Sequence, residues 1–285
     1  MINETDLSFE NLSDYDVYHL NSWENNIDDR LKLLLSHLNL SDLNDEETTS
    51  IISICRKYND VFHLEGDSLP AATAAIHNIP LKVNTNPIYQ KPYRMPESMK
   101  TEIHRQVQEM LTNDIIEESD SPWNFPLLAV PKKSEDGSKK WRIVVDFRRL
   151  NDVTVDRVFP LPNISEILDQ LGRAVYFSTL DLSNGFHQVL LDGDDKNKTA
   201  FSTSYGHYHF KRIPFGLKGA PSTFQHMMNK VLSGLNGVKC SSTWMILLFM
   251  EKTLLDHNQK LEEIFNCLRQ NSLKLNPRKC QFLKK

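Results

Sequence analysis

Hydrophobic and polar positions follow two different periods along this chain, and the change between them lies near residue 75. In the first part, apolar side chains recur every three or four positions and predict two amphipathic helices, over residues 28–38 and 45–58. The acidic run that opens the second helix favours its N-terminus, because the helix dipole is positive there. Residues 1–26 have no clear period and are expected to form a weakly ordered tail. Residues 68–75 are small and indicate a linker.

After this linker, short β-type runs alternate with prolines and charged turns. Strands are predicted over 77–83 and 174–182, hairpins over 125–130 with 141–147 and over 199–205 with 207–213, and helices over 96–113, 164–171, 221–235 and 254–271. The strands and helices do not follow a regular βαβ alternation, so the fold class expected is α+β.

Composition is typical of a globular protein from the cell interior. Of the 285 residues, 40% are hydrophobic and 25% are charged, enough for one large or two small cores. The longest apolar run is too short for a membrane span, and no N-terminal segment has the pattern of a signal peptide. The four cysteines have neither zinc-ligand spacing nor the density of a disulfide framework. We therefore expect an intracellular protein that is neither secreted nor bound to a membrane.

Charge is distributed unevenly between the two parts of the chain. Residues 1–70 hold 15 acidic and 4 basic side chains, a net charge of −11. Residues 71–285 hold 22 acidic and 29 basic side chains, a net charge of +7. A basic region can contact the phosphates of nucleic acids, although many basic domains bind none. We expect an acidic, partly helical leader over residues 1–75 and a separate functional region over 76–285.

Four motifs in the basic part make the prediction specific. They read KKWRIVVDFRRLN at 139–151, FSTLDLSNGFHQ at 177–188, KTAF at 198–201 and PFGLKGAPSTFQ at 214–225. In order and content they closely resemble the reverse transcriptase of gypsy-type LTR retrotransposons, which is part of a Pol polyprotein. The resemblance extends from about residue 76 to residue 285, and more faintly to the YNDVF segment at 58–62.

The resemblance implies a polymerase palm, an antiparallel sheet backed by helices, with a fingers subdomain around it. The palm would comprise about 161–188 and 220–285, and the chain would stop before the family's thumb. The implied activity is RNA-directed DNA synthesis by two-metal nucleotidyl transfer, on an RNA or DNA template with a primer and with deoxynucleoside triphosphates. In an intact element the remainder of the Pol polyprotein would accompany it, in a cytoplasmic virus-like particle or in the nucleus.

Asp181 is the predicted catalytic residue, because it ends a β-type run inside the second motif. Nucleotidyl transfer needs two divalent cations a few ångströms apart, and hard ions such as Mg²⁺ prefer carboxylate oxygens. The end of a strand can hold such a carboxylate rigidly at the edge of a sheet. The alternatives are an ordinary surface aspartate and an unrelated α+β enzyme that uses Asp181 with His187.

By the resemblance, further residues would bind the deoxynucleotide: Lys132, Lys133, Arg142, Phe186, Phe215 and Gly216. The three basic residues come from a hairpin that, in the family, folds over the triphosphate and gives it charge-assisted hydrogen bonds. Phe186 would fill the place of a ribose 2′-hydroxyl, the group that distinguishes RNA from DNA. The remaining two would line the pocket, where glycine allows a close backbone approach. The alternatives are a solvated hairpin tip for the lysines and a core aromatic for Phe186.

The family's second catalytic hairpin, Tyr-Leu-Asp-Asp, has no counterpart where it is expected. That interval, residues 240–252, reads CSSTWMILLFMEK and contains no adjacent carboxylates, although the flank LKLNPRKC at 273–280 still matches. Met245 and Ile246 stand at the two metal-binding positions, so one acid of three remains. We therefore expect this copy to be inactive, with two Mg²⁺ ions no longer properly bound.

The genetic code suggests a cause for this loss. Trp244, Met245 and Ile246 must be encoded TGG ATG ATN, and the same bases read one register earlier give NTG GAT GAT. The last two codons specify Asp-Asp whatever the synonymous choices, with no change in length. Our hypothesis is a one-base deletion near Cys240 compensated by a one-base insertion near Lys252, in a decayed copy or through a sequence error. The coding DNA would distinguish this from a chance apolar strand.

A rival hypothesis from another functional class is a catalytically dead nucleic-acid-binding module, either a relic or a domesticated protein. The basic part of the chain and the missing carboxylates favour it. Salt-dependent binding to an RNA–DNA duplex without primer extension would support it.

Overall fold

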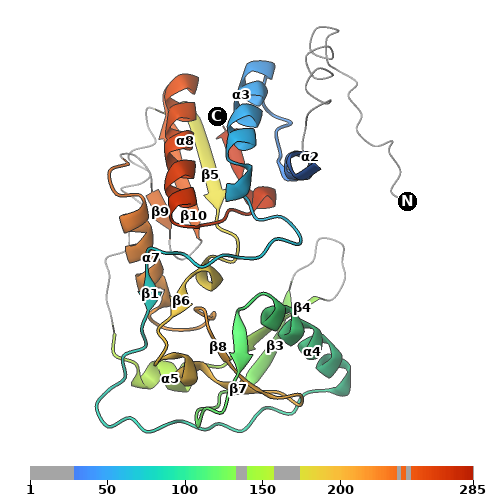
Figure 1. Cartoon of the computed structure of the whole chain (residues 1–285), viewed down its shortest axis with the longest axis vertical. Helices are drawn as coiled ribbons and strands as arrows, with labels where there is room; N and C mark the ends of the chain where they lie inside the picture. Colours follow the sequence, from blue (N-terminus) through green and yellow to red (C-terminus); the bar gives the residue numbers. More distant parts are fainter. Residues whose placement is uncertain (1–28, 133–139, 157–173, 236–238, 242–244, 285) are drawn as a thin grey trace.

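The structure is a computed structural model and describes residues 29–132, 140–156, 174–235, 239–241 and 245–284 (Figure 1). The predicted tail over 1–26, the predicted helix over 164–171 and Lys133 lie outside the described residues. No helix among those described is long and apolar enough to cross a membrane.

A four-stranded antiparallel sheet in the order β11–β5–β10–β9 carries the second motif. Its strands are β5 (Tyr176–Asp181), β9 (Lys239–Ser241), β10 (Ile246–Glu251) and β11 (Gln281–Lys284). Helices α7 (Ala220–Val231) and α8 (Leu254–Gln270) pack against β9 and β10 respectively. This is the predicted palm, an antiparallel sheet backed by helices, and the α+β fold class is confirmed.

The helices of the acidic leader pack on the same core. Helix α2 (Asp29–His37) and helix α3 (Asp45–Lys57) match their predicted positions closely. Asn44 and Glu47 form a reciprocal capping box at the start of α3, which satisfies amide groups that have no partner within the helix. Helix α3 lies beside α8 (Figure 1), and Phe62 meets Phe265 of α8 edge to face at 5.4 Å between ring centres. The leader is therefore attached to the palm by buried apolar contacts.

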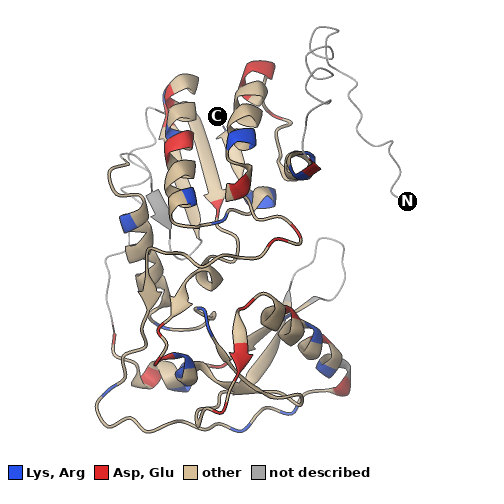
Figure 2. Ribbon diagram, viewed as in Figure 1, with Lys and Arg blue, Asp and Glu red and all other residues tan. Residues whose placement is uncertain are grey.

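Ion pairs also join the leader to the palm. Arg269 of α8 pairs with Asp60, and Lys57 of α3 pairs with Glu262 of α8. Both helices carry side chains of both signs (Figure 2). Each side of this boundary thus supplies one acid and one base, but such exposed pairs contribute little to stability compared with the apolar contacts.

The remaining part of the fold surrounds a long hairpin. Strands β3 (Leu127–Lys132) and β4 (Lys140–Val145) pair over their whole length, and helix α4 (Glu97–Thr112) packs against β4. A three-stranded sheet β2–β8–β7 lies next to them, with β2 (Ile116–Glu118), β7 (Phe201–Ser202) and β8 (His207–Phe210). The predicted helix over 96–113 and both predicted hairpins are confirmed, the second hairpin with shorter strands.

The strand predicted over 77–83 is wrong in its length. Strand β1 contains only Ile76–His77 and pairs in parallel with β6 (Leu190–Leu191). Pro80 has no amide hydrogen to donate to a neighbouring strand, and beyond it only an isolated bridge joins Leu81 to Thr154. The other described short elements are η1 (Asn59–Val61), α5 (Arg148–Val153), η3 (Gly185–Gln188), η4 (Lys196–Thr199) and η5 (Pro277–Lys279).

Candidate active site

Asp181 is the last residue of β5 and stands opposite Ile246, the first residue of β10. The pairing continues beyond the strand end, because the amide of Leu182 donates to the carbonyl of Met245 at 3.0 Å. On the other side of β5, the amide of Asn276 donates to the carbonyl of Asp181 at 2.8 Å. The backbone around the predicted catalytic carboxylate is therefore held from both sides.

The side chain of Asp181 is 13% exposed and pairs with a cation from η5. Lys279 places its Nζ 3.6 Å from the Asp181 Oδ2 atom. Burial raises the pKa of this carboxyl above its usual value, and Lys279 opposes that shift only in part. The free-energy cost of burying the ionised Asp181 carboxylate is thus only partly offset by its attraction to Lys279.

Met245 has an unusual backbone conformation directly before β10. Its φ of +55° lies in the left-handed region, which a side chain with a Cβ atom adopts only at some cost. The Met245 side chain lies against Gly185, and a Cβ atom added to this glycine would lie 2.7 Å from the methionine sulfur. Glycine at 185 therefore leaves the room that the methionine occupies.

The turn after Asp181 is fixed by Gln188, which is fully buried at the end of η3. Its Nε2 donates to the carbonyls of Ser183 and Lys274 at 2.6 and 2.9 Å, and its Oε1 accepts the Lys274 amide at 2.8 Å. A buried amide with these three bonds holds the turn against the segment that leads to η5. Gln188 thus positions the turn after Asp181, a role that was not predicted from the sequence motifs.

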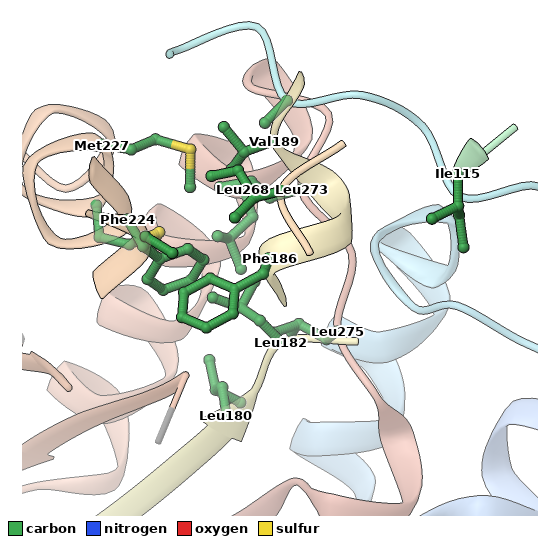
Figure 3. Close-up of a cluster of buried hydrophobic side chains, with 14 of the residues drawn as sticks. Ile115, Leu180, Leu182, Phe186, Val189, Phe224, Met227, Leu268, Leu273 and Leu275 are labelled. Atoms are coloured by element: carbon green, nitrogen blue, oxygen red, sulfur yellow. The ribbon is translucent and has the colours of Figure 1, made fainter. Parts of the chain in front are cut away.

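Phe186, in the turn after Asp181, is packed in the hydrophobic core. It is 8% exposed and meets Phe215 and Phe224 edge to face, with ring centres 5.6 and 5.7 Å apart. Figure 3 shows its ring beside Phe224, near Leu180 and Leu182. The side chain is therefore part of the hydrophobic core, and it contacts Phe215, which lines the neighbouring cavity, without lining that cavity itself.

A cavity of about 730 Å³ separates α4 and β4 from the turn after Asp181. Arg142, Asn184, His187 and Phe215 are among the residues that line it. The Arg142 guanidinium lies 5.7 Å from the centre of the Phe215 ring, and the His187 ring lies 5.3 Å from it. Burial, with Arg212 and Arg142 nearby, lowers the pKa of His187 to about 4. The cavity also has Arg105, Glu102 and Glu109 in its wall, so it offers two guanidinium groups and two carboxylates besides a neutral imidazole at neutral pH and an aromatic wall.

Gly216 follows Phe215 with a φ of +94°, a conformation that favours glycine. Asn151 of α5 fixes this turn, since its Nδ2 donates to the Gly216 carbonyl at 2.8 Å and its Oδ1 accepts the Lys218 amide at 2.9 Å. The turn therefore presents Phe215 to the cavity from a constrained backbone.

The residues at this site do not fit a pair of Mg²⁺ ions. Among the residues that the structure describes, no three His, Cys, Asp or Glu side chains gather in a group that could hold a metal. Mg²⁺ binds through oxygen ligands, and the position opposite the Asp181 carboxylate is held by the aliphatic Ile246. The side chain that pairs with Asp181, Lys279, is itself a cation.

Comparison with known proteins decides the family. Residues 130–285 match the family described as reverse transcriptase (RNA-dependent DNA polymerase). The chain belongs to this family. The family prediction made from the four motifs is thereby confirmed.

The reverse transcriptase relatives are retrotransposon polyproteins much longer than this chain. The Retrovirus-related Pol polyproteins from transposons 412 and 297 of Drosophila melanogaster are 42% and 40% identical to it, over 99% and 89% of its length. These alignments cover 22% and 24% of the two polyproteins, so the chain spans about a quarter of their length. The Pol polyprotein from Drosophila transposon gypsy is 32% identical over 87% of the chain.

Solved reverse transcriptases have the same fold. A foamy viral protease–reverse transcriptase in complex with double-stranded DNA has a TM-score of 0.77 and 25% identity, covering 90% of this chain and 44% of that one. The foamy viral enzyme in complex with an RNA/DNA hybrid has the same TM-score and identity, and is covered over 33% of its length. The palm and fingers architecture is therefore that of a reverse transcriptase.

The structure brings together some of the residues predicted from sequence for the reverse transcriptase site. Asp181 lies beside Met245 and Ile246, and Arg142 and Phe215 line the cavity. Phe186 contacts Phe215, and Gly216 follows it in the chain, but neither is among the residues that line the cavity. Lys132 ends β3, but its side chain and all of Lys133 lie outside the described part. The roles predicted for these residues stay predictions.

Two residues near the site, Gln106 and Lys279, were not predicted from the sequence. Gln106 lines the cavity from α4, and Lys279 is the charged neighbour of Asp181. Lys279 lies in the LKLNPRKC segment that matched the family, which was a usable signal. Gln106 lies on a helix with only a general amphipathic pattern, and nothing in its sequence context distinguishes it.

Proposed function

We propose that this chain is the fingers and palm of a retrotransposon RNA-directed DNA polymerase whose present sequence has no polymerase activity. The observation that carries the proposal is the pairing of Asp181 with Ile246 at the end of β5. In the intact family, the two residues at positions 245 and 246 would be aspartates that share two Mg²⁺ ions with Asp181. An aliphatic side chain at the position opposite Asp181 provides no oxygen ligand.

In this proposal the 730 Å³ cavity is the deoxynucleotide pocket. Arg142, with Lys132 and Lys133 of the same hairpin, would neutralise the triphosphate, because charge-assisted hydrogen bonds to phosphate are strong. Phe215, which lines the cavity, and Gly216 next to it in the chain would be the residues nearest the sugar and base. Phe186 would stand at the 2′ position, where its contacts with Phe215 and Phe224 hold the ring. The partners would be a primer on an RNA or DNA template and the rest of a Pol polyprotein.

Nearby acids do not replace the missing carboxylates. Glu251 is at the far end of β10, opposite Tyr176, and five residue-to-residue steps along the strand place it about 17 Å from Ile246. Asp256 is engaged with Thr253 at the start of α8. A misplacement of a single ångström already slows a catalytic step strongly. Neither acid can therefore complete a metal site with Asp181.

Primer extension tests this proposal directly. The full chain is incubated with a labelled DNA primer on an RNA template, all four deoxynucleoside triphosphates and either Mg²⁺ or Mn²⁺. We expect no extension beyond the background of a protein-free reaction, while an active reverse transcriptase in parallel extends the primer. Robust extension by this chain would overturn the proposal of inactivity.

The coding DNA tests the proposed cause separately. If codons 241–252, read one register earlier, do not spell Tyr-Leu-Asp-Asp, the compensated frameshift is excluded. The proposal of inactivity would then stand on the geometry alone.

A second candidate function is nucleic-acid binding without catalysis. Residues 71–285 have a net charge of +7, and the similar foamy viral enzyme was solved with an RNA/DNA hybrid. Binding of an RNA–DNA duplex that weakens steeply as salt rises would support this function, because released counterions drive such association. Absence of binding at low salt would exclude it and leave a relic without either activity.

A further inference from the structure

Gln106 of α4 joins this helix to β4 through both ends of its side-chain amide. Its Nε2 donates to the carbonyl of Trp141 at 2.8 Å, and its Oε1 accepts the amide of Ile143 at 3.2 Å. The two backbone groups belong to the residues immediately before and after Arg142. Gln106 and Arg142 also line the same cavity.

Strand geometry explains why these two groups are available. Along a strand, the carbonyl of one residue and the amide two positions later point to the same edge, and the groups of the intervening residue point to the opposite edge. Arg142 is paired with Val130 of β3 on that opposite edge. On the free edge of β4 the Gln106 amide therefore takes the place of a peptide group from a third strand.

The orientation of the Gln106 amide is itself fixed by its neighbours. The Nε2 also donates to the Glu102 Oε1 at 2.6 Å, so both of its hydrogens are engaged. Arg105 holds the Glu102 carboxylate through two bonds, of 2.9 and 2.7 Å. A guanidinium, a carboxylate and an amide along one face of α4 thus form a connected network that ends on the backbone around Arg142.

The Arg142 side chain depends on that backbone for its direction. Arg142 is exposed, and its guanidinium approaches the Phe215 ring at 5.7 Å. Among the described residues no carboxylate forms an ion pair with it. A long side chain of this kind has many rotamers, so the position of its Cα and the twist of its strand decide where the guanidinium can reach.

We propose that Gln106 is a positioning residue for Arg142, and that it sets where the guanidinium meets the triphosphate of a bound deoxynucleotide. The inference rests on the proposed function of the cavity and adds a residue to it. In this arrangement α4 and the arginine strand move as one unit, so Gln106 acts on ligand affinity through Arg142 and not by its own contact.

Nucleotide binding to the full chain tests the proposal without any need for catalysis. The probe is dTTP, titrated while tryptophan fluorescence is recorded, since Trp141 lines the cavity. Gln106→Met keeps the length of the side chain but removes its hydrogen bonds, and we expect about tenfold weaker binding. The matched control is Gln108→Met, the same change on an exposed position of the same helix, with unchanged affinity expected.

A double-mutant cycle separates positioning from direct contact. Arg142→Ala should weaken dTTP binding, and adding Gln106→Met to Arg142→Ala should cause no further loss. Additive losses would overturn the proposal, because Gln106 would then act independently of Arg142. Unchanged affinity of the single Gln106→Met variant would overturn it as well.

The same cycle distinguishes failure of this inference from failure of the proposed function. If Arg142→Ala leaves dTTP affinity unchanged, the cavity is not the triphosphate site, and both its proposed role as the nucleotide pocket and the positioning role of Gln106 fall. If only the Gln106 change is silent, the nucleotide site stands and the positioning role falls. Should Gln106→Met not fold, Gln106→Leu replaces it, because it is also uncharged and removes both the donor to Trp141 and the acceptor for Ile143.

Discussion

Asp181 and Ile246 are direct cross-strand partners, one at the end of β5 and the other at the start of β10. Residues opposite each other in an antiparallel pair have their side chains on one face, with Cβ atoms about 5 Å apart. A carboxylate at position 246 would therefore lie close enough to Asp181 to share a cation with it. Under the proposed function, this pair is the place where the family's metal site would stand, and Ile246 provides no oxygen ligand for it.

Restoring the two acids should restore metal binding. In the Met245→Asp/Ile246→Asp double variant, we expect Mn²⁺ or Mg²⁺ to raise the melting temperature, because an ion bound only by the folded state stabilises it. At a concentration 100 times the dissociation constant the gain is about 2.7 kcal/mol. Aspartate also tolerates the left-handed backbone at position 245 better than methionine does. Melting curves with and without MnCl₂ measure the effect.

The unmodified chain and the double variant that also carries Asp181→Asn are the two controls. Neither should respond to Mn²⁺ at the same concentration. A double variant that melts at the same temperature with and without metal would mean that position 246 does not face Asp181 as the strand pairing implies.

Asp181→Asn should stabilise the unmodified chain at neutral pH. Burial raises the pKa of the Asp181 carboxyl in the folded state, so the folded protein binds this proton more tightly than the unfolded chain does. The ionised carboxylate therefore lowers stability at neutral pH, and asparagine removes that cost. The advantage should shrink as the pH falls toward the unfolded-state pKa of about 3.9.

Thermal melts at pH 7 and pH 4 measure this difference. The control is Asp194→Asn, at an exposed aspartate, which should leave the melting temperature nearly unchanged. A lower melting temperature for Asp181→Asn at pH 7 would show that Lys279 compensates the carboxylate fully, contrary to the expectation.

Helices and strands were predicted well from the sequence where apolar residues recur with a single helical or strand period. Helix α4 was predicted over 96–113 and contains Glu97–Thr112, because its apolar residues recur with the helical period along one face. Strand β1 was predicted too long, because the apolar residues Ile79, Leu81 and Val83 keep the alternation of a strand on both sides of Pro80, which has no amide hydrogen to donate. Strand β7 was predicted within 199–205 but contains only Phe201–Ser202, because only these two residues pair with β8.

Site residues that stand within a short sequence motif could be predicted, and residues whose role depends on contacts distant in sequence could not. Asp181, Phe186 and Phe215 were predicted as site residues because they stand in motifs that resemble those of a known family. Gln106 meets residues 35 and 37 positions away, and this contact depends on how α4 lies against the edge of β4. No pattern within the helix contains that information, so only the folded arrangement shows it.

Gly185→Ala should destabilise the chain through Met245. A Cβ atom at Gly185 would lie 2.7 Å from the Met245 sulfur and 3.2 Å from a ring carbon of Phe224. Overpacking of this kind costs about 1–3 kcal/mol in free energy of unfolding. With Met245→Ala in the background the sulfur is absent, so the loss caused by Gly185→Ala should be smaller.

Urea unfolding of the four proteins in this cycle gives the coupling energy. Gly193→Ala is the matched control, since a Cβ there has nothing within 4 Å. Equal losses in both backgrounds would show that Phe224, and not Met245, sets the limit at this position.

Acid should destabilise the palm through His257, which is fully buried on α8. Its Nε2 lies 2.8 Å from the Ser178 Oγ of β5, and its ring stacks on Phe249 of β10 at 4.9 Å. Burial lowers the pKa of His257 to about 4, while the unfolded histidine titrates near 6.5. The unfolded chain therefore takes up this proton first as the pH falls, and the stability present above pH 6.5 is lost progressively down to about pH 4.

The expected slope for this one group is at most about 1.4 kcal/mol per pH unit, and His187, with a pKa also near 4, adds a similar contribution. His257→Gln removes one titrating group, so its free energy of unfolding should fall less steeply between pH 6.5 and 4 than that of the unmodified chain. Urea unfolding across this range measures the slope, and the exposed His226→Gln serves as the control. Identical slopes for the His257 variant and the unmodified chain would mean that His257 becomes protonated inside the fold, where the packing against Phe249 would have to open to admit water.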